Sequence, residues 1–231
     1  MSKLAVVTGA SRGIGYETGL SLAKHACNVM AVARSEDKLK TLQSQYPNYI
    51  NYFPADLTHQ SHLAELVEHL SGKTKGVDIL INNAGALVNK PFTALTKEDW
   101  QHMLDANLMS VINVTRAMLP LLNTDSHIIN ISSMGGFQGS DKFPGLTAYS
   151  VAKGAVSILS ECLAAEFADK GIYVNALCLG SVQTGMFETA FPDFSADVSP
   201  DKMGTYIADF ALNGSTFYNG RVLPVALSSP S

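Results

Sequence analysis

Tyr149 and Lys153 lie four residues apart, in the segment Tyr149-Ser-Val-Ala-Lys153. On a helix this spacing places both side chains on one face, about one turn apart. A cation beside a phenol favours the phenolate, so we expect Lys153 to lower the pKa of Tyr149 from its usual value of about 10. The pair therefore predicts a side chain that donates or accepts a proton near neutral pH.

Three glycines near the start of the chain, Gly9, Gly13 and Gly15, follow an apolar run and precede a helical pattern. Glycines at such a turn let the backbone approach a pyrophosphate, and the helix N-terminus supplies N–H donors and positive potential. Their spacing is Gly-x3-Gly-x-Gly and not the Gly-x-Gly-x2-Gly of ordinary dinucleotide folds. A tight turn without a ligand is the alternative, but the strand–turn–helix context favours a nicotinamide cofactor that transfers a hydride.

The end of the second apolar run bears on the choice between NAD and NADP. An NAD site usually has an Asp or Glu there, about 20 residues beyond the glycines, to bind the ribose 2′-hydroxyl. Arg34 stands at that place, 19 residues after Gly15, and Arg12 lies in the glycine loop. Two guanidinium groups suit a 2′-phosphate. We therefore expect NADP, with NAD as the alternative if Glu36 or Asp37 binds a hydroxyl instead.

Short apolar runs must form the frame that positions these residues, and most are apolar or β-branched at nearly every position. This composition is typical of strands buried on both faces of a parallel sheet. The runs are 4–7, 29–33, 49–53, 77–81, 127–131, 173–179 and 222–225.

Helical patterns separate these runs, at 13–26, 36–45, 60–70, 96–119 and 148–168. Ser35 and Thr96 are candidate N-caps, and Asp99 follows Thr96 by three residues, as in a capping box. The alternation predicts right-handed crossovers and a three-layer α/β/α fold, a doubly wound, Rossmann-type parallel sheet of seven strands with helices on both faces. Such folds bind ligands beyond the carboxyl ends of their strands, where the motifs fall.

The composition fits a single globular domain over residues 1–231, with 46% hydrophobic and 16% charged residues and no reason to expect disorder. A net charge of −4 gives no reason to expect binding to nucleic acid or to an anionic membrane. No apolar run reaches the roughly 18 residues of a membrane span, and none resembles a signal peptide. The three cysteines, Cys27, Cys162 and Cys178, lack metal-site spacing, and we interpret them as reduced core residues of a cytoplasmic protein.

Taken together, these residues resemble the short-chain dehydrogenase/reductase family, in its single-domain, NADP-preferring branch. The segment Thr8-Gly-x3-Gly-Ile-Gly15 resembles the family's cofactor loop, and Asp56 resembles its adenine-contacting Asp. Asn82-Asn-Ala-Gly85 resembles the motif that stabilises the sheet beside the cofactor. Asn107, Ser133 and Tyr149-x3-Lys153 match the catalytic centre, in the family's order along nearly the whole chain.

The resemblance implies a role for each matched residue. Tyr149 would exchange a proton with the substrate oxygen, Ser133 would orient and polarise the carbonyl, and Lys153 would tune Tyr149 and bind the nicotinamide ribose. Asn107 would hold a water in a proton relay. No metal site is expected. The cofactor-binding residues would be Gly9, Ser11, Arg12, Gly13, Ile14, Gly15, Arg34, Asp56, Leu57, Asn83, Ala84, Gly85, Tyr149, Lys153, Val182 and Thr184.

The chain departs from the family pattern around the expected substrate pocket. Leu179 stands where the family usually has a proline, which frees the backbone there. The gap of 16 residues from Ser133 to Tyr149 is about three longer than is common. We expect residues 135–145 to form an unusual wall of the pocket, where Phe137 and Phe143 contact substrate or pack within the loop.

A segment at about 183–213, inserted before the last strand, corresponds to the family's mobile substrate lid. It contains Met186, Phe187, Phe191 and Phe194, which suggest a substrate with an apolar body or pack on the protein. The resemblance also implies a homodimer through the helices at 96–119 and 148–168, or a homotetramer to which the last strand and the tail ending in Ser231 contribute.

We therefore expect an NADP-dependent oxidoreductase that transfers a hydride reversibly between the nicotinamide and a ketone, an aldehyde or a secondary alcohol. A 3-oxoacyl thioester on an acidic carrier protein is one possible substrate, and Arg116, Lys142 and Lys170 are candidate basic residues near the pocket mouth. The alternative is a catalytically silent, NADP-binding regulator or scaffold. Relatives of that kind typically lose the Tyr or the Lys, and both are present here.

Overall fold

A seven-stranded parallel sheet forms the centre of the molecule in the computed structural model, which describes residues 2–72 and 74–227. The expected tail contribution to a tetramer falls on residues outside this described part. The strand order is β3-β2-β1-β4-β5-β6-β7, so the chain reverses its winding direction between β1 and β4. The strands are β1 (Leu4–Thr8), β2 (Asn28–Ala33), β3 (Ile50–Pro54), β4 (Val77–Asn82), β5 (Leu122–Ser133), β6 (Tyr173–Leu179) and β7 (Val222–Val225).

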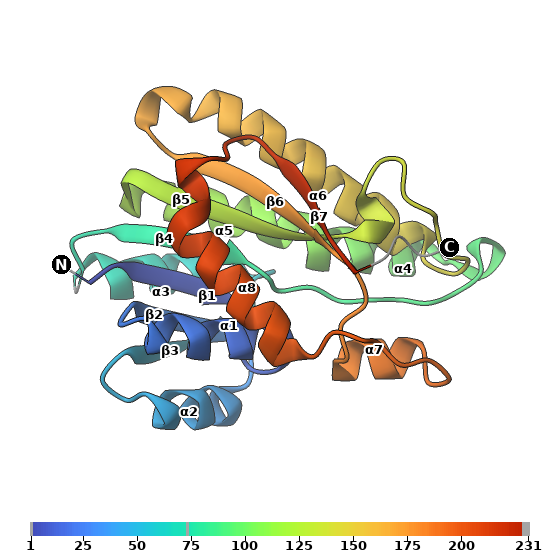
Figure 1. The fold of residues 1–231 in the computed structure, drawn as a ribbon, viewed down its shortest axis with the longest axis horizontal. Helices are drawn as coiled ribbons and strands as arrows, with labels where there is room; N and C mark the ends of the chain where they lie inside the picture. Colours follow the sequence, from blue (N-terminus) through green and yellow to red (C-terminus); the bar gives the residue numbers. More distant parts are fainter. Residues whose placement is uncertain (1, 73, 228–231) are drawn as a thin grey trace.

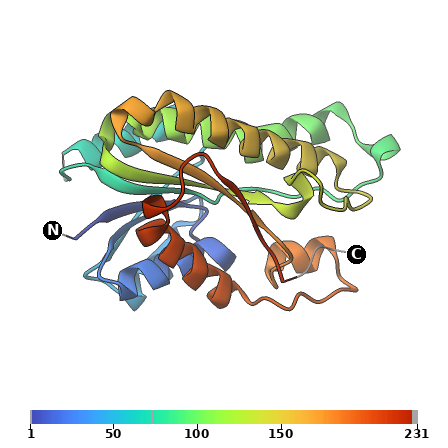
Figure 2. The same cartoon turned by 45° about the horizontal axis from the view of Figure 1, so that its top comes forward.

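Helices cover both faces of this sheet and make the three layers that the sequence predicted (Figures 1 and 2). On one face, α1, α2 and α8 pack over side chains such as Val7 and Ile79, and on the other α3, α5 and α6 pack over Val6 and Leu80. Neighbouring positions of one strand thus face opposite layers, and both are fully buried. The helices are α1 (Gly13–Lys24), α2 (Glu36–Gln45), α3 (Gln60–Ser71), α4 (Lys97–Leu104), α5 (Ser110–Met118), α6 (Thr147–Glu166), α7 (Gly185–Ala190) and α8 (Pro200–Asn213).

The expected single helix over residues 96–119 is interrupted. Thr96 and Asp99 form the predicted capping box at the start of α4, but a π-helical turn over Asp105–Met109 separates α4 from α5. A π turn depends on which carbonyl each N–H reaches and leaves the apolar periodicity almost unchanged, so the pattern of residues does not reveal it.

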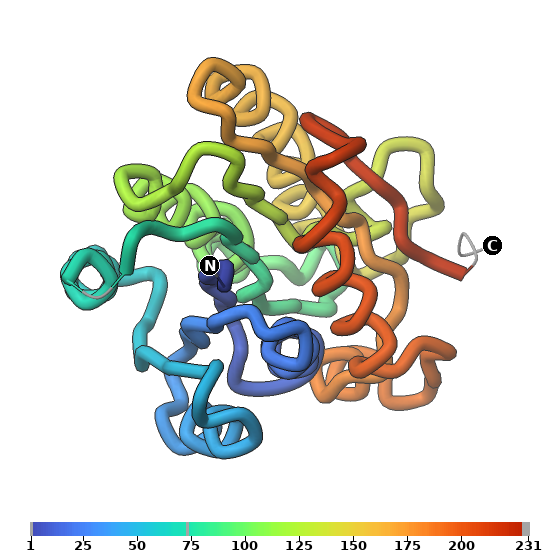
Figure 3. Tube along the Cα trace, turned by 60° about the vertical axis from the view of Figure 1, so that its left-hand side comes forward, coloured from blue at the N-terminus to red at the C-terminus, as the bar shows by residue number. Residues whose placement is uncertain are grey.

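The segment expected as a lid, 183–213, divides into two parts with different surroundings. Helix α8 packs beside α1, as Figure 3 shows, with Ile207 and Ala208 fully buried. Gly204 lies so close to α1 that a β-carbon would come within 2.6 Å of the Glu17 β-carbon. Helix α8 therefore belongs to the packed core, and the term lid is used below for residues 183–199 alone.

The carboxyl ends of the strands meet at one edge of the sheet, where α7 also lies (Figure 1). Among the residues described, no helix is both long and apolar enough to cross a membrane. Cys27 and Cys178 are buried as expected, but Cys162 is exposed on α6, because it lies on the helix face that turns away from the sheet.

Candidate active site

A cavity of about 1140 Å³ extends along the loops that follow β1 to β6, across the point where the winding direction reverses. Residues far apart in the sequence meet here because parallel strands bring their carboxyl ends to one edge. The sequence-predicted residues that line it are Gly9, Ser11, Arg12, Gly13, Ile14, Arg34, Asp56, Leu57, Asn83, Ala84, Gly85, Asn107, Ser133, Tyr149, Lys153, Val182 and Thr184.

Gly15 is the exception among the predicted cofactor residues. It is buried in the first turn of α1, and a β-carbon there would come within 2.6 Å of the Gly9 carbonyl oxygen. The structure thus gives Gly15 a packing role, and its contact with a cofactor stays a prediction. Its missing side chain lets α1 start directly against the loop after β1.

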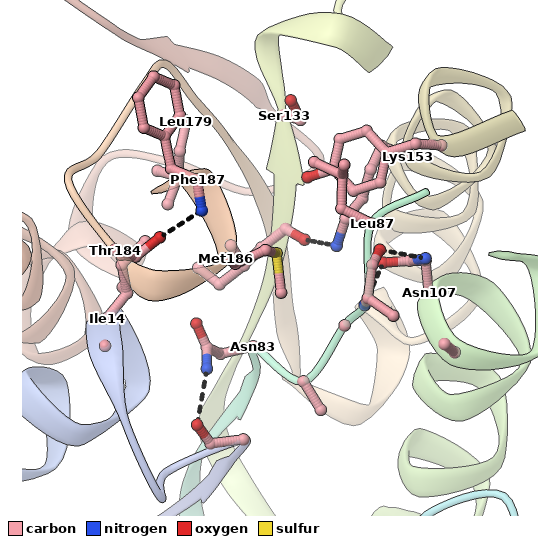
Figure 4. Close-up of a pocket in the computed structure, with 18 of the residues that line it drawn as sticks. Ile14, Asn83, Leu87, Asn107, Ser133, Lys153, Leu179, Thr184, Met186 and Phe187 are labelled. Carbon is pink, nitrogen blue, oxygen red and sulfur yellow. Dashed lines mark hydrogen bonds between the residues drawn. The ribbon is translucent and has the colours of Figure 1, made fainter. Parts of the chain in front are cut away.

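The loops after β1 and β4 are locked together by reciprocal hydrogen bonds. The Thr8 hydroxyl accepts from the backbone N–H groups of Asn83, at 3.0 Å, and Ala84, at 3.1 Å. The Asn83 side-chain amide donates to the Thr8 carbonyl oxygen at 3.0 Å and to the Gly9 carbonyl oxygen at 3.4 Å, and Figure 4 shows the second bond. Gly9 has a positive φ of 68° and no room for a β-carbon beside Ala84, so only glycine fits this close approach.

The N-terminus of α1 opens into the cavity without a side-chain cap. Arg12 is the N-cap residue, and its side chain makes no capping hydrogen bond. The first N–H groups of the helix therefore have no side-chain acceptor, and the helix dipole places positive potential at the same point. This arrangement fits a diphosphate, so the residues present suit a dinucleotide cofactor.

Three cationic side chains surround the far end of the cavity, beyond β2. Arg12 and Arg34 are both exposed and line it, as predicted. Lys38, which the sequence analysis did not single out, lines it as well. The available signal was its position, because Lys38 lies in the first turn of α2, which directly follows the loop that carries Arg34.

Asp56, at the end of β3, lies beside this cationic group. Burial raises the pKa of its carboxyl group, but hydrogen bonds from Thr58 and the charges of His59 and Arg34 outweigh burial and lower it overall. The Asp56 Oδ1 atom accepts from the Thr58 hydroxyl at 2.7 Å and from the Thr58 N–H at 3.0 Å. Asp56 is therefore ionised and fixed in place at neutral pH.

Ser133, Tyr149 and Lys153 come together at the opposite end of the cavity. Ser133 ends β5, and the other two lie in the first two turns of α6, on one helix face as the spacing predicted. Lys153 is only 4% exposed, and its Nζ atom donates to the Ile131 carbonyl oxygen at 2.8 Å. The same atom lies 5.9 Å from the centroid of the Tyr149 ring.

The expected lowering of the Tyr149 pKa is not found. Burial raises the pKa of the phenol above its usual value, and the hydrogen bond with Ser133 offsets only part of that effect. Burial acts on Lys153 too and lowers the pKa of its ammonium group to about 8. The spacing of the two residues reveals the nearby charge of Lys153 but not the low-dielectric surroundings, which disfavour the charged form of both groups.

Asn107 lies fully buried in the π-helical turn, and both its Oδ1 atom and the Lys153 Nζ atom lie against Gly85. Its side-chain amide donates to the carbonyl oxygens of Ala86 and Met103, each at 3.0 Å, and its Oδ1 accepts from the Ala86 N–H at 3.2 Å (Figure 4). The side chain thus ties the loop after β4 to the helix. Any part that Asn107 takes in a relay falls to its backbone, because these bonds occupy the side chain.

Apolar side chains dominate the walls around Tyr149. Figure 4 shows Leu87 and Met186 reaching into the cavity from the loop after β4 and from the lid. Phe143, from the loop between β5 and α6, also lines the cavity, whereas Phe137 does not. Phe187 and Phe191 pack with tilted rings, 5.3 Å between centroids, and Phe194 meets Phe191 edge-on at 6.4 Å. All three lid aromatics line the cavity.

The basic residues expected at the mouth are placed otherwise. Lys142 donates to the Phe137 carbonyl oxygen and, at 2.7 Å, to the Ser140 hydroxyl, so it closes its own loop. Arg116 lies in the last turn of α5, and Lys170 lies between α6 and β6. Both are at the amino edge of the sheet, opposite the cavity, because helices run back from the carboxyl edge.

Leu179 stays in the ladder to the end of β6, where it pairs with Ser133 and Val225. The backbone is therefore held there, and not freed as the missing proline suggested. Thr184 lines the cavity and accepts from the Phe187 N–H at 3.2 Å, which starts α7. Within residues 2–72 and 74–227, no three His, Cys, Asp or Glu side chains gather to hold a metal ion.

Comparisons with known proteins agree with this geometry. A family model described as short chain dehydrogenase matches residues 3–194. An uncharacterised oxidoreductase of Staphylococcus saprophyticus is 36% identical over 188 residues, which cover 79% of each chain. A 3-oxoacyl-[acyl-carrier-protein] reductase of Thermotoga maritima is 28% identical over 239 residues, which cover 96% of each chain.

Solved structures give the same result. A variant of actinorhodin polyketide ketoreductase crystallised with NADPH superimposes with a TM-score of 0.86 and 27% identity, over 97% of this chain and 96% of that one. A dehydrogenase/reductase from Sinorhizobium meliloti shares the fold with a TM-score of 0.89 at 23% identity, over 100% of this chain and 96% of that one. The chain therefore belongs to the short-chain dehydrogenase/reductase family of nicotinamide-dependent oxidoreductases.

Proposed function

We propose that the protein is an NADPH-dependent carbonyl reductase, which interconverts a ketone or aldehyde with an apolar body and the corresponding alcohol. One observation carries the proposal. Ser133, Tyr149 and Lys153 gather at one end of the cavity, while Arg12, Arg34 and Lys38 surround the other end. The uncapped start of α1 lies between these two ends.

The three residues at the reacting end divide the proton chemistry between them. The Ser133 hydroxyl oxygen accepts from the Gly135 N–H at 3.1 Å, which leaves its proton to orient the substrate carbonyl. Burial keeps Tyr149 protonated at neutral pH, so its hydroxyl gives a proton to the carbonyl oxygen. Lys153, with a pKa of about 8, holds the cofactor ribose and returns a proton at near-neutral pH. Bound NADPH supplies the hydride to the carbonyl carbon.

The cationic group favours NADPH over NADH. Two guanidinium groups and an ammonium group match the double charge of a 2′-phosphate, and bidentate arginine contacts suit its oxygens. Asp56 follows β3, whereas the end of β2, where an NAD site usually has its acidic residue, carries Arg34. The alternative cofactor is NAD, whose ribose hydroxyl would bind Glu36 or Asp37.

The apolar walls favour a substrate with an apolar body over a charged one. A 3-oxoacyl thioester on an acidic carrier protein stays within the proposal, since a relative of that name aligns over most of the chain. Two of the basic residues expected to meet such a carrier, Arg116 and Lys170, lie at the opposite edge of the sheet, and the ammonium group of Lys142 is bonded within its own loop, which weighs against a protein-borne substrate.

The test is to replace Tyr149 with Phe and to assay NADPH oxidation against acetophenone, benzil, cyclohexanone and an acetoacetyl thioester. Loss of the phenol proton lowers turnover by about 10² to 10⁴. NADPH affinity, measured by fluorescence titration, stays within about twofold because cofactor charge is held elsewhere. Near-normal turnover in Tyr149→Phe contradicts the mechanism, and tight NADPH binding without turnover of any carbonyl by the native protein favours the silent regulator.

We also propose that the protein acts in the cytoplasm as a homodimer. Val151 and Ile158 are 50% and 60% exposed on one face of α6, and Met109 is 40% exposed on the neighbouring helical turn. An apolar strip of this kind supports self-association. Replacing Ile158 with Glu is expected to yield monomers in light scattering, and an unchanged mass contradicts this interface.

A further inference from the structure

The lid is closed at its base by backbone contacts. Val182 and Val198 pair as an isolated parallel bridge, and the Gln183 N–H donates to the Val198 carbonyl oxygen at 2.8 Å. The two ends of the lid thus leave the body of the protein at one point. The tip of the lid lies at the end of α7, away from this base. Its position therefore depends on a hinge motion at the base and on the contacts that the tip itself makes.

Hydrogen bonds within the lid make it a stiff unit. The Gln183 Oε1 atom accepts from the Ala196 N–H at 2.8 Å, and its Nε2 atom donates to Glu188 Oε1 at 2.9 Å. The Gln183 side chain thereby joins the segment before α7, α7 itself and the segment after it. A lid tied together in this way moves as one piece, so a single contact at its tip can set the position of all its cavity-lining side chains.

Asn89 makes such a contact from the opposite wall. Its Nδ2 atom donates to the Ala190 carbonyl oxygen at 2.9 Å, across 101 residues of sequence. Ala190 is the last residue of α7, where helix carbonyls have no partner within the helix. The next residue, Phe191, lines the cavity, as does Asn89 itself.

The wall that carries Asn89 is itself anchored. The neighbouring residue Lys90 pairs with Asp99 of α4 at 2.8 Å, and its N–H donates to the Gly145 carbonyl oxygen at 3.0 Å. Gly145 has a φ of +86° and lies against the Asn89 Oδ1 atom with no room for a β-carbon. Asn89 is therefore held between α4 and the loop before α6, and its amide group points at the lid.

We propose that Asn89 is a positioning residue, a latch that holds the lid tip over the substrate end of the cavity and so places Phe191 against the substrate. The latch itself rests on contacts that are independent of the reaction, whereas its effect on turnover rests on the proposed carbonyl reductase function. The bond crosses the mouth of the cavity between two loops, so breaking it frees the tip without removing a packed side chain from the core.

The first experiment measures hydrogen–deuterium exchange of the full chain with NADPH bound, in Asn89→Ala and Asn89→Asp. The aspartate has the shape of asparagine but lacks the N–H donor, so it removes the bond and keeps the volume. Exchange at the amides of residues 188–194 is expected to rise about fivefold in both variants. The control is Asn213→Ala, an exposed asparagine that bonds within α8, where exchange in this segment stays unchanged.

The second experiment measures kcat and KM with NADPH and the best ketone of the panel. A loosened tip raises the KM for the ketone about fivefold in both Asn89 variants, while the NADPH dissociation constant stays within about twofold. Unchanged exchange overturns the latch, and raised exchange with an unchanged KM overturns its positioning role. If the native protein reduces no ketone, the proposed function fails, and the exchange measurement still decides on the latch alone.

Discussion

The two halves of the cavity are built by different means. In the cofactor half, short loops bind one another through backbone groups and fixed polar side chains, as Thr8 and Asn83 do. In the substrate half, the loop before α6 and the lid contribute aromatic side chains to the cavity wall, and the lid meets the opposite wall through a few contacts such as that of Asn89. The first half is specified by strand ends and the second by loops, so substrate choice can change without disturbing cofactor binding.

The largest effect is expected at Lys153, where the two halves join. Its pKa is about 8 in the folded protein and about 10.4 when unfolded, so the unfolded chain binds more protons between these values. The free energy of unfolding therefore gains up to about 3 kcal/mol from this group as pH rises from 8 to 10.4. Lys153→Met lacks this gain, which urea unfolding across that pH range measures.

The control for Lys153 is Lys170→Met, which removes a lysine from the amino edge of the sheet. It is expected to follow the native pH dependence. If Lys153→Met also follows the native curve, the pH dependence of the free energy of unfolding does not come from Lys153. The lowered pKa assigned to this buried lysine is then wrong.

A smaller effect, confined to the cofactor half, is expected at Arg34. Arg34→Asp loses charge-assisted bonds to a 2′-phosphate and weakens NADPH binding about thirtyfold, while NADH binding holds or improves. Fluorescence titration of both cofactors measures the ratio. Arg116→Asp, at the opposite edge, carries the same charge change and leaves both affinities unaltered. Equal losses of NADPH and NADH would refute the assignment of Arg34 to the 2′-phosphate.

The smallest of the three effects is expected in the substrate half. Phe191→Ala removes an apolar wall that is partly buried, which raises the KM for an apolar-bodied ketone about tenfold and leaves NADPH binding within about twofold. Phe217→Ala is the matched control, since Phe217 is 82% exposed and lies outside the cavity. A loss of NADPH affinity as large as the change in KM would contradict the statement that the substrate half can change without affecting cofactor binding.

The sequence predicted the sheet well because strands buried on both faces must be apolar at nearly every position. All seven runs are strands, and even the short β7 has the predicted bounds. The residues that line the cavity were largely predictable too, since motifs at strand ends must meet at one edge. The same reasoning did not separate Gly15 from Gly9 and Gly13, because spacing does not say which glycines line the cavity and which one packs against the loop after β1.

Electrostatic surroundings and loop paths escaped prediction. The Tyr149 pKa depends on how deeply the phenol is buried, which the interval to Lys153 does not reveal. The role of Lys142 depends on how its loop folds back onto Phe137. Arg116 could have been excluded from the mouth, because its position late in a helix places it at the far edge of the sheet.

The π-helical turn at Asp105–Met109 interrupts the regular helix but places the Asn107 side chain against Ala86. Such a turn closes over one residue more than an α-helical turn does. Deleting one residue there would convert it into an ordinary α-helical turn and leave α4 and α5 in nearly the same orientation. Asn107 lies inside the widened turn, so its side chain would lose the position from which it binds Ala86, and the loop beside Lys153 would lose its tether. A shorter and smoother helix would make a poorer enzyme, so this irregularity is a place where sequence length itself is under constraint.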